Sequence, residues 1–288
     1  MANSSNEVHV GSRDKSSSWY TKTDPNVSET TREVLEKYSN IPAADVVAHC
    51  HRIRDLAWEI YPYPCIGTFR FLDLSISLLP VYSEMVQRLR TGEQTFLDLG
   101  TCFGQDIRRL VYDGVPSEKT YGSDLKLDFM QLGYEMFLDK ETLKTTFVAG
   151  DVFDAESDLK QLHGQIDILQ ASAFFHLFDR EKQKKVAHRV VKLLKPREGS
   201  LLVGRQVGSV KPGEYSHRTN SEMMFRHDPS SWTQMWDEIG QETGSKWDVQ
   251  AELHEVVGAG NPRALPTAEQ QQLYEDVRWI VFSVRRLS

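Results

Sequence analysis

From residue 95 onward, short apolar segments alternate with helix-like segments, and this alternation constrains the fold more than any other feature of the 288-residue chain. Strands are expected over residues 95–99, 120–123, 146–149, 166–171 and 200–204. Helices are expected between them, around residues 107–111, 125–138 and 179–194. The strands are apolar at successive positions, which is typical of parallel strands buried on both faces. The sequence therefore predicts an α/β fold with a parallel sheet covered by helices on both faces.

The N-terminal third of the chain has a different character. Residues 1–18 are polar and rich in serine, so we expect a flexible arm there. Residues 19–93 are expected to form a helical extension or lid, with helices over residues 43–61 and 81–90. Residues 94–288 are then expected to form the ligand-binding core.

The C-terminal part is expected to finish the sheet after a long loop. Residues 206–228 show no clear period and are expected to be irregular. Loops of that length are often functional, and His217 and Arg218 within this one are possible ligand contacts. A helix is expected over residues 231–241, where apolar residues recur at helical spacing. Two final strands are expected at residues 247–253 and 279–284.

Composition narrows the class of protein. Lys and Arg number 34 against 41 Asp and Glu, and the net charge of -7 disfavours binding to nucleic acid. The sequence has no long apolar run for a membrane span and no apolar segment for a secretory signal, so a cytoplasmic location is expected. The three cysteines form no Cys-x-x-Cys pair and the nine histidines do not cluster, so neither a disulfide scaffold nor a metal site is expected.

The turn after the first predicted strand is the most informative segment. Residues 96–106 read Phe-Leu-Asp-Leu-Gly-Thr-Cys-Phe-Gly-Gln-Asp. Gly100 allows a sharp turn and a close approach of the backbone to a ligand, and Gly104 allows the next helix to pack closely. Asp98 stands where a carboxylate could face that ligand. By itself this pattern fits equally well a tight turn that binds nothing.

Two further acidic residues follow the next strands. Asp124 ends the second strand, 26 residues after Asp98, where a carboxylate can accept hydrogen bonds from both ribose hydroxyls. Asp151 ends the third strand and could accept the exocyclic amine of adenine, with Val152 and Phe153 beside the ring. Any one of these acids could instead cap a helix. Their occurrence at three consecutive strand ends predicts an adenosine site.

These motifs resemble those of the class I S-adenosylmethionine-dependent methyltransferases, and the resemblance covers residues 95–285. It implies a Rossmann-like seven-stranded sheet with helices on both faces, preceded by the N-terminal helical extension. It also implies S-adenosyl-L-methionine as the cofactor and S-adenosyl-L-homocysteine as the product. One departure is Cys102, which replaces the middle glycine of the family's turn. The implied cofactor residues are Asp98, Gly100, Thr101, Cys102, Gly104, Ser123, Asp124, Leu125, Gly150, Asp151, Val152, Phe153 and Ala171.

Four stretches resemble a narrower group, the fungal O-methyltransferases of polyketide-terpenoid (meroterpenoid) pathways: residues 64–72, 103–106, 174–178 and 202–206. Members of that group typically methylate the carboxyl of a farnesylated orsellinic-type acid. The resemblance therefore implies a small hydrophobic aromatic or terpenoid acid as the acceptor and a methyl ester as the product. Methylation of a phenolic hydroxyl of an aromatic polyketide is the alternative.

The two acceptors make different demands on the protein. A carboxylic acid is already ionised at neutral pH, whereas a phenol is mostly protonated and gains from a general base. His176, after the fourth strand, is the candidate base for a phenol or a hydrogen-bond donor to a carboxylate; simple packing among its aromatic neighbours is equally open. Arg205, expected to end the fifth strand, could hold a carboxylate, and an ordinary surface arginine is the alternative.

The sequence disfavours two other classes of protein. A nicotinamide-dependent oxidoreductase is disfavoured because Cys102 and Gln105 stand where the dinucleotide-binding motif has its second and third glycines. A catalytically silent, methyltransferase-like partner subunit is disfavoured by the intact acids at the strand ends. A homodimer formed through the N-terminal helices stays open.

Overall fold

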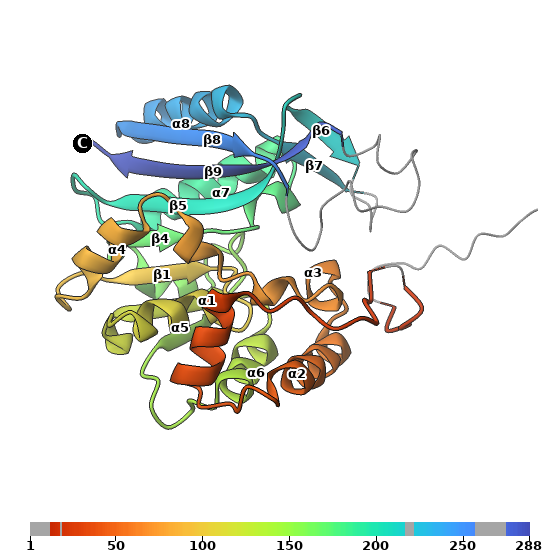
Figure 1. Ribbon diagram of the computed structural model, residues 1–288. Coiled ribbons are helices and arrows are strands. Elements are labelled where there is room, and N and C mark those ends of the chain that lie inside the picture. Colours follow the sequence, from red (N-terminus) through yellow and green to blue (C-terminus); the bar gives the residue numbers. More distant parts are fainter. Residues whose placement is uncertain (1–11, 18, 217–221, 257–274) are drawn as a thin grey trace, which may run out of the picture.

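The structure is a computed structural model that describes residues 12–17, 19–216, 222–256 and 275–288. Its centre is a sheet in the order β3-β2-β1-β4-β5-β9-β8, in which β1 to β5 are parallel and β9 runs antiparallel to both neighbours (Figure 1). These strands are β1 (Phe96–Leu99), β2 (Thr120–Asp124), β3 (Thr146–Ala149), β4 (Ile168–Gln170), β5 (Leu201–Ser209), β8 (Trp247–His254) and β9 (Val277–Arg286). The predicted α/β fold with a seven-stranded sheet is confirmed.

Helices cover both faces of the sheet, as predicted (Figure 1). The α-helices are α1 (Glu29–Arg32), α2 (Val46–Ile60), α3 (Pro64–Gly67), α4 (Tyr82–Leu89), α5 (Gln105–Tyr112), α6 (Leu127–Phe137), α7 (Arg180–Leu193) and α8 (Pro229–Thr243). Short helical turns are η1 (Glu33–Tyr38), η2 (Arg70–Leu72), η3 (Ser75–Leu78), η4 (Ser117–Lys119), η5 (Asp158–Leu162) and η6 (Phe175–Leu177). On one face α4 and α5 pack on Phe96 and Ile168. On the other, α7 and α8 pack on Leu97 and Leu169, because successive side chains of a strand alternate between faces.

The expectation of an irregular loop over residues 206–228 is wrong. β5 continues to Ser209 because nine consecutive residues pair with the distant strand β9. Two further strands, β6 (Gly213–Ser216) and β7 (Met223–Arg226), then form an antiparallel hairpin. These two strands have four residues each and are partly exposed, so the local sequence carries no strong period. His217 and Arg218 lie outside the described residues.

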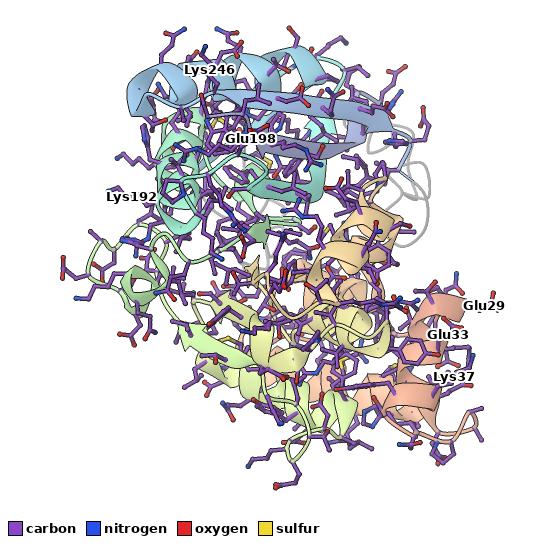
Figure 2. All side chains as sticks on the ribbon, turned by 90° about the vertical axis from the view of Figure 1, so that its left-hand side faces the viewer. Glu29, Glu33, Lys37, Lys192, Glu198 and Lys246 are labelled. Atoms are coloured by element: carbon purple, nitrogen blue, oxygen red, sulfur yellow. The ribbon has the colours of Figure 1, made fainter. Side chains whose placement is uncertain are left out.

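The N-terminal extension packs along α6. Val46, Cys50, Ile53 and Ala57 recur every three or four positions of α2 and are fully buried in a cluster shared with α6. Pro62, two residues after α2 ends, stops the helix. Figure 2 shows the labelled side chains of α1 and η1 at the opposite side of the molecule from Lys246, which precedes β8.

Most of the expected flexible arm, residues 1–11 and 18, lies outside the described part of the chain. Within the remainder, the indole nitrogen of Trp58 on α2 donates a hydrogen bond to the backbone oxygen of Arg13 at 3.1 Å. This short segment therefore lies against the extension.

A buried ion pair in the core accepts a hydrogen bond from the extension. The guanidinium of Arg108 on α5 binds both carboxylate oxygens of Asp139, at 2.8 and 2.9 Å, and both side chains are almost fully buried. The hydroxyl of Tyr38, from η1, donates to the same carboxylate at 2.7 Å. Arg108 also donates to the backbone oxygen of Phe103 at 2.6 Å. Each partner satisfies the others, so loss of one leaves a buried charge uncompensated.

We therefore expect Asp139→Ala to lower the free energy of unfolding by about 3–5 kcal/mol, because the Arg108 charge stays buried without its partner. Urea denaturation followed by circular dichroism measures this change. Glu156→Ala, which breaks an exposed ion pair with Lys160, is the matched control and should change stability little. Equal effects in the two variants would show that the buried pair is not a major support of the fold.

Candidate active site

The residues predicted to bind the cofactor meet at one edge of the sheet. This is the edge to which β1 points, and α3 and the β6–β7 hairpin lie on the same side of the molecule (Figure 1). The parallel register pairs Leu99 with Ser123 and Asp124 with Ala149, so the carboxyl ends of β1, β2 and β3 lie together. Ala171 follows β4 at the same edge. In open α/β sheets, ligands bind outside these strand ends.

The turn after β1 has the backbone geometry that its glycines predict. Gly100 and Gly104 have φ angles of +78° and +68°, in the left-handed region that favours glycine. Cys102 also has a positive φ, +52°, although it carries a side chain. The carboxylate of Asp124 accepts the backbone N–H of Cys102 at 2.9 Å, which fixes the turn against the end of β2. The departure from the family's glycine is thus accommodated, with local backbone strain.

The end of β2 keeps binding capacity for a ligand. Asp124 also accepts the backbone N–H of Lys126 at 3.1 Å, and burial raises the pKa of its carboxyl. An ionised carboxylate offers about four acceptor positions, so capacity remains beside these two bonds. The hydroxyl oxygen of Ser123 is buried and has no hydrogen-bond partner among the described residues. Polar groups of this kind fit a bound, hydroxyl-bearing ligand.

An apolar surface flanks these acids. Leu125 is 62% exposed and Phe153 is 40% exposed, while Val152, in the segment after β3, is buried. Asp151 is exposed, and its carboxylate accepts the backbone N–H of Phe153 at 2.8 Å. The arrangement fits a flat heterocycle that covers the apolar side chains and presents a polar edge to a carboxylate.

Asp98 lies inside the protein rather than on the surface of the site. Its carboxylate accepts the hydroxyl of Thr101 at 2.7 Å and the side-chain amide of Gln170 at 3.2 Å. The same amide nitrogen donates to Asp106 at 2.6 Å, so two buried carboxyls share one donor. Burial, reinforced by the neighbouring Asp106, raises the pKa of Asp98 to about 8. Asp98 therefore supports the turn after β1 from inside the protein, through its hydrogen bond with Thr101.

The loop after β4 lies over the turn after β1. A Cβ atom at Gly100 would lie 2.6 Å from the ring of Phe174, so only glycine fits beneath this ring. His176 is half-buried in η6, and its backbone N–H donates to the side-chain oxygen of Gln206 on β5 at 3.2 Å. Ala173 has a φ of +51°. The loop thus brings His176 to the predicted edge.

Arg205 lies in the middle of β5, not at its end as expected, because β5 is extended by its pairing with β9. The backbone oxygen of Arg205 accepts the N–H of Ala173 at 2.7 Å, which places Arg205 just beyond the end of β4. Its guanidinium stacks over the ring of Trp279 at 4.6 Å and lies 3.8 Å from Asp73. Arg70 stacks over the same ring at 4.4 Å.

Sequence reasoning missed Arg70, Asp73 and Trp279. Arg70 falls within a stretch that resembles the fungal group, and this was the only available signal. The three residues come from η2, the segment after it and β9, and only the folded chain brings them together.

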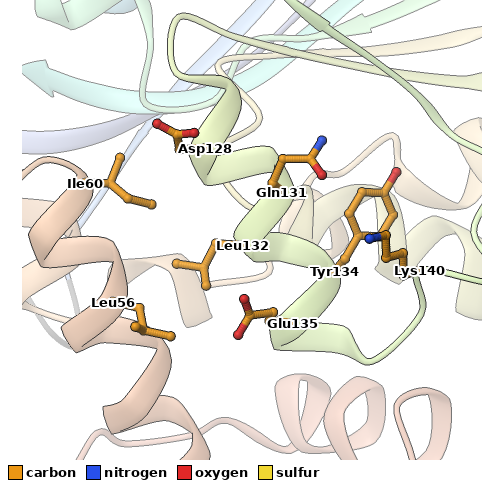
Figure 3. A pocket seen from close by; sticks show the side chains of 8 residues that line it. All are labelled: Leu56, Ile60, Asp128, Gln131, Leu132, Tyr134, Glu135 and Lys140. Atoms are coloured by element: carbon orange, nitrogen blue, oxygen red, sulfur yellow. The ribbon is translucent and has the colours of Figure 1, made fainter.

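A hollow of about 420 Å³ lies elsewhere, between α2 and α6 (Figure 3). It shares no lining residue with the strand-end site; its walls are Leu56, Ile60, Asp128, Gln131, Leu132, Tyr134, Glu135 and Lys140. Over the described ranges no three potential metal ligands come together, and no helix there could cross a bilayer.

Comparisons with known proteins identify the family. The model of the meroterpenoid methyltransferase N-terminal domain matches residues 19–72. The O-methyltransferase phiE from Fungal sp. is 46% identical over 250 residues, covering 83% of each chain. The asnovolin E/chermesin D methyltransferase nvfJ from Aspergillus novofumigatus is 46% identical over 225 residues, covering 78% of this chain and 81% of the relative. The chain belongs to this family of fungal O-methyltransferases.

A solved structure supports the fold. Phosphoethanolamine N-methyltransferase 2 from Haemonchus contortus, crystallised with S-adenosylhomocysteine, has a TM-score of 0.51 at 15% identity, covering 82% of this chain and 60% of that chain. The protein is thus an O-methyltransferase enzyme of fungal secondary metabolism, with the Rossmann-like fold of S-adenosylmethionine-dependent methyltransferases. The oxidoreductase and silent-subunit alternatives are set aside.

The buried carboxyl of Asp98 predicts a pH dependence of stability. Its pKa in the folded protein, about 8, lies above the value of about 4 in an unfolded chain. The folded state therefore binds more protons between these values, and the free energy of unfolding should fall as pH rises through this range. In Asp98→Asn the fall should be smaller.

Urea titrations at about pH 5 and about pH 8 measure this difference. Asp151→Asn removes an exposed carboxylate from the same edge and should keep the wild-type pH dependence. An Asp98→Asn variant with the full wild-type difference would assign the effect to other groups.

Proposed function

We propose that the enzyme methylates the carboxyl of a small hydrophobic aromatic or terpenoid acid, of the farnesylated orsellinic type, to a methyl ester. The observation that carries the proposal is Arg205, a largely buried guanidinium just beyond the end of β4. Its only carboxylate partner among the described residues, Asp73, lies at 3.8 Å, which is too far for a hydrogen bond. Its N–H groups are therefore available to a ligand carboxylate in planar geometry. The family description, meroterpenoid methyltransferase, supports an acceptor of this kind.

The residues at the strand ends fit S-adenosylmethionine. Asp124 would hold the ribose hydroxyls, and Asp151 the amine of adenine. Leu125 and Phe153, exposed beside these acids, would cover the adenine ring. The turn at residues 100–104 would hold the methionine part, where Gly100 leaves no side chain in the way.

When bound, S-adenosylmethionine supplies a methyl group on a sulfonium: the O–CH3 bond forms as the S–CH3 bond breaks, and the electron pair of that bond stays on sulfur. A carboxylate acceptor has no proton to lose at neutral pH, so no residue needs to act as a base. The task of the protein is to hold one carboxylate oxygen in line with the methyl group. Arg205 would do so by binding the acid, and the loop that carries Phe174 and His176 would exclude water.

We keep phenol methylation as the second candidate, because η6 holds His176 at the same edge through the hydrogen bond of its backbone to Gln206. In that reaction His176 would accept the phenolic proton. In carboxyl methylation the same side chain would donate a hydrogen bond to the acid.

We also propose that residues 19–93 form the wall of the acceptor site and residues 94–288 the cofactor-binding core. Support comes from Asp73, which follows η2 of the extension and lies beside Arg205 of the core.

The product of the reaction decides between the two acceptors. Labelled S-adenosylmethionine and a farnesylated orsellinic-type acid, which carries both a carboxyl and phenols, are incubated with the enzyme and then treated with mild alkali. We expect the label to be released as methanol, as from a methyl ester, and His176→Ala to retain most of the activity. Label that survives alkali would be an ether and would contradict carboxyl methylation; His176→Ala should then abolish a rate that rises with pH near neutrality.

The cofactor assignment is tested by binding. Asp124→Ala should weaken binding of S-adenosylhomocysteine about tenfold or more, because a hydrogen bond to a charged group is lost. Isothermal titration calorimetry measures the affinity, and thermal unfolding checks that the variant is folded. Asp128→Ala, on nearby α6, is the control and should bind as the wild type does. Unchanged affinity in Asp124→Ala would remove the second strand end from the cofactor site.

A further inference from the structure

We propose that Arg70 and Arg205, both in contact with the ring of Trp279, together form a two-guanidinium anchor for the acceptor carboxylate, with Asp73 as a resident counter-ion. The anchor rests on the proposed function and extends it, because it names a residue of the N-terminal extension that recognises the acid. It also predicts that the enzyme distinguishes the acid from its methyl ester by charge.

The geometry brings two cations to one aromatic ring. The guanidinium carbons of Arg70 and Arg205 lie 4.4 and 4.6 Å from the centroid of Trp279. Trp279 is only 6% exposed, so its ring is a fixed surface. Arginine, with its planar delocalised cation, stacks on such rings while its N–H edge stays free for a carboxylate.

The local charges do not balance. Asp73 lies 3.8 Å from each guanidinium, and neither arginine side chain donates a hydrogen bond to any described residue. The side chains of Arg70 and Arg205 are only 22% and 14% exposed, and burial lowers the pKa of both. Two largely desolvated cations thus share one distant carboxylate. A ligand anion with direct hydrogen bonds would offset this cost.

Asp106 is the other acid close enough to interact electrostatically with Arg205, and its carboxylate already accepts three hydrogen bonds. It accepts the hydroxyl of Ser75 at 3.0 Å, the backbone N–H of Ile76 at 3.2 Å and the amide of Gln170 at 2.6 Å. Burial raises the pKa of Asp106, which weakens it further as a counter-charge. The side-chain N–H groups of the two arginines therefore remain available to hydrogen-bond a ligand.

The backbone around the anchor is strained, as at many functional sites. Phe69, directly before Arg70, has a φ of +58°, and Ala173, whose N–H bonds to the backbone of Arg205, has a φ of +51°. Neither residue is glycine, so both conformations are costly and must be held by the surrounding packing. Strain at these two positions is consistent with a fixed placement of the guanidiniums.

The anchor has a consequence for the catalytic cycle. Esterification removes the negative charge of the acceptor, so the product loses the charge-assisted hydrogen bonds that held the substrate. The acid should therefore bind more tightly than its own methyl ester, and release of the product should be favoured.

The experiment measures binding to the full-length enzyme saturated with S-adenosylhomocysteine. The probes are a prenylated 2,4-dihydroxybenzoic acid and its methyl ester, titrated by calorimetry. We expect Arg70→Gln to weaken binding of the acid about ten- to a hundredfold and to leave the affinity for the ester and for S-adenosylhomocysteine unchanged. Arg52→Gln, on α2 and paired with Glu135 at the surface, is the matched control and should change neither affinity.

Asp73→Asn is the second variant, and it removes the resident counter-ion while keeping both arginines. It should strengthen binding of the acid severalfold without changing that of the ester. The anchor is overturned if Arg70→Gln keeps the wild-type preference for acid over ester, or if Asp73→Asn leaves acid binding unchanged or weaker. Binding of S-adenosylhomocysteine shows that each variant is folded.

The two proposals fail separately. Label that survives alkali overturns carboxyl methylation, yet Arg70→Gln can still abolish the preference for the acid and so support the anchor. Conversely, a methyl ester product with no effect of Arg70→Gln supports the proposed function and overturns the anchor.

Discussion

The side-chain amide of Gln170 donates to two buried carboxyls, and the candidate site is built around this interaction. Asp98 belongs to β1 and Asp106 to α5, so one amide at the end of β4 ties three elements together. Ser75 and Ile76 of the extension complete the network from the other side. In a low-dielectric interior the loss of one member of such a network is costly. The turn after β1 is therefore linked through Asp98 to β4 and α5.

The same network lies between the proposed cofactor site and the proposed acceptor site. Above Asp98 lies the turn that is proposed to hold the cofactor, and beside Asp106 lies Arg205, proposed to hold the acid. A methyl transfer depends mainly on the relative placement of donor and acceptor. In the proposed reaction, a shared buried scaffold would provide that placement. The ion pair between Arg108 and Asp139, joined by Tyr38, fixes the extension against the core in the same way.

Under the proposed anchor, the extension contributes directly to the acceptor site. The family model covers residues 19–72, which include Arg70, while Arg205 and Trp279 come from the core. Neither part alone has two guanidiniums on one ring. An acid acceptor offers one charge in a fixed plane, and arginines from two parts of the chain match it. A contribution of the N-terminal domain to the acceptor site is consistent with a family that is recognised by this domain.

The sequence alone determined the parallel sheet, the turn at Gly100 and the positions of Asp124 and Asp151 at the ends of the second and third strands, because apolar strands and the residues that end them are local signals. It also predicted the family, through short motifs. It misjudged β5, and with it Arg205, because a strand's length is set by pairing with a partner far along the chain. It could not show that Arg70, Arg205 and Trp279 come together, or that Asp98 is buried. Only the tertiary structure decided these, since contacts between distant segments and the loss of solvent around a charge have no period in the sequence.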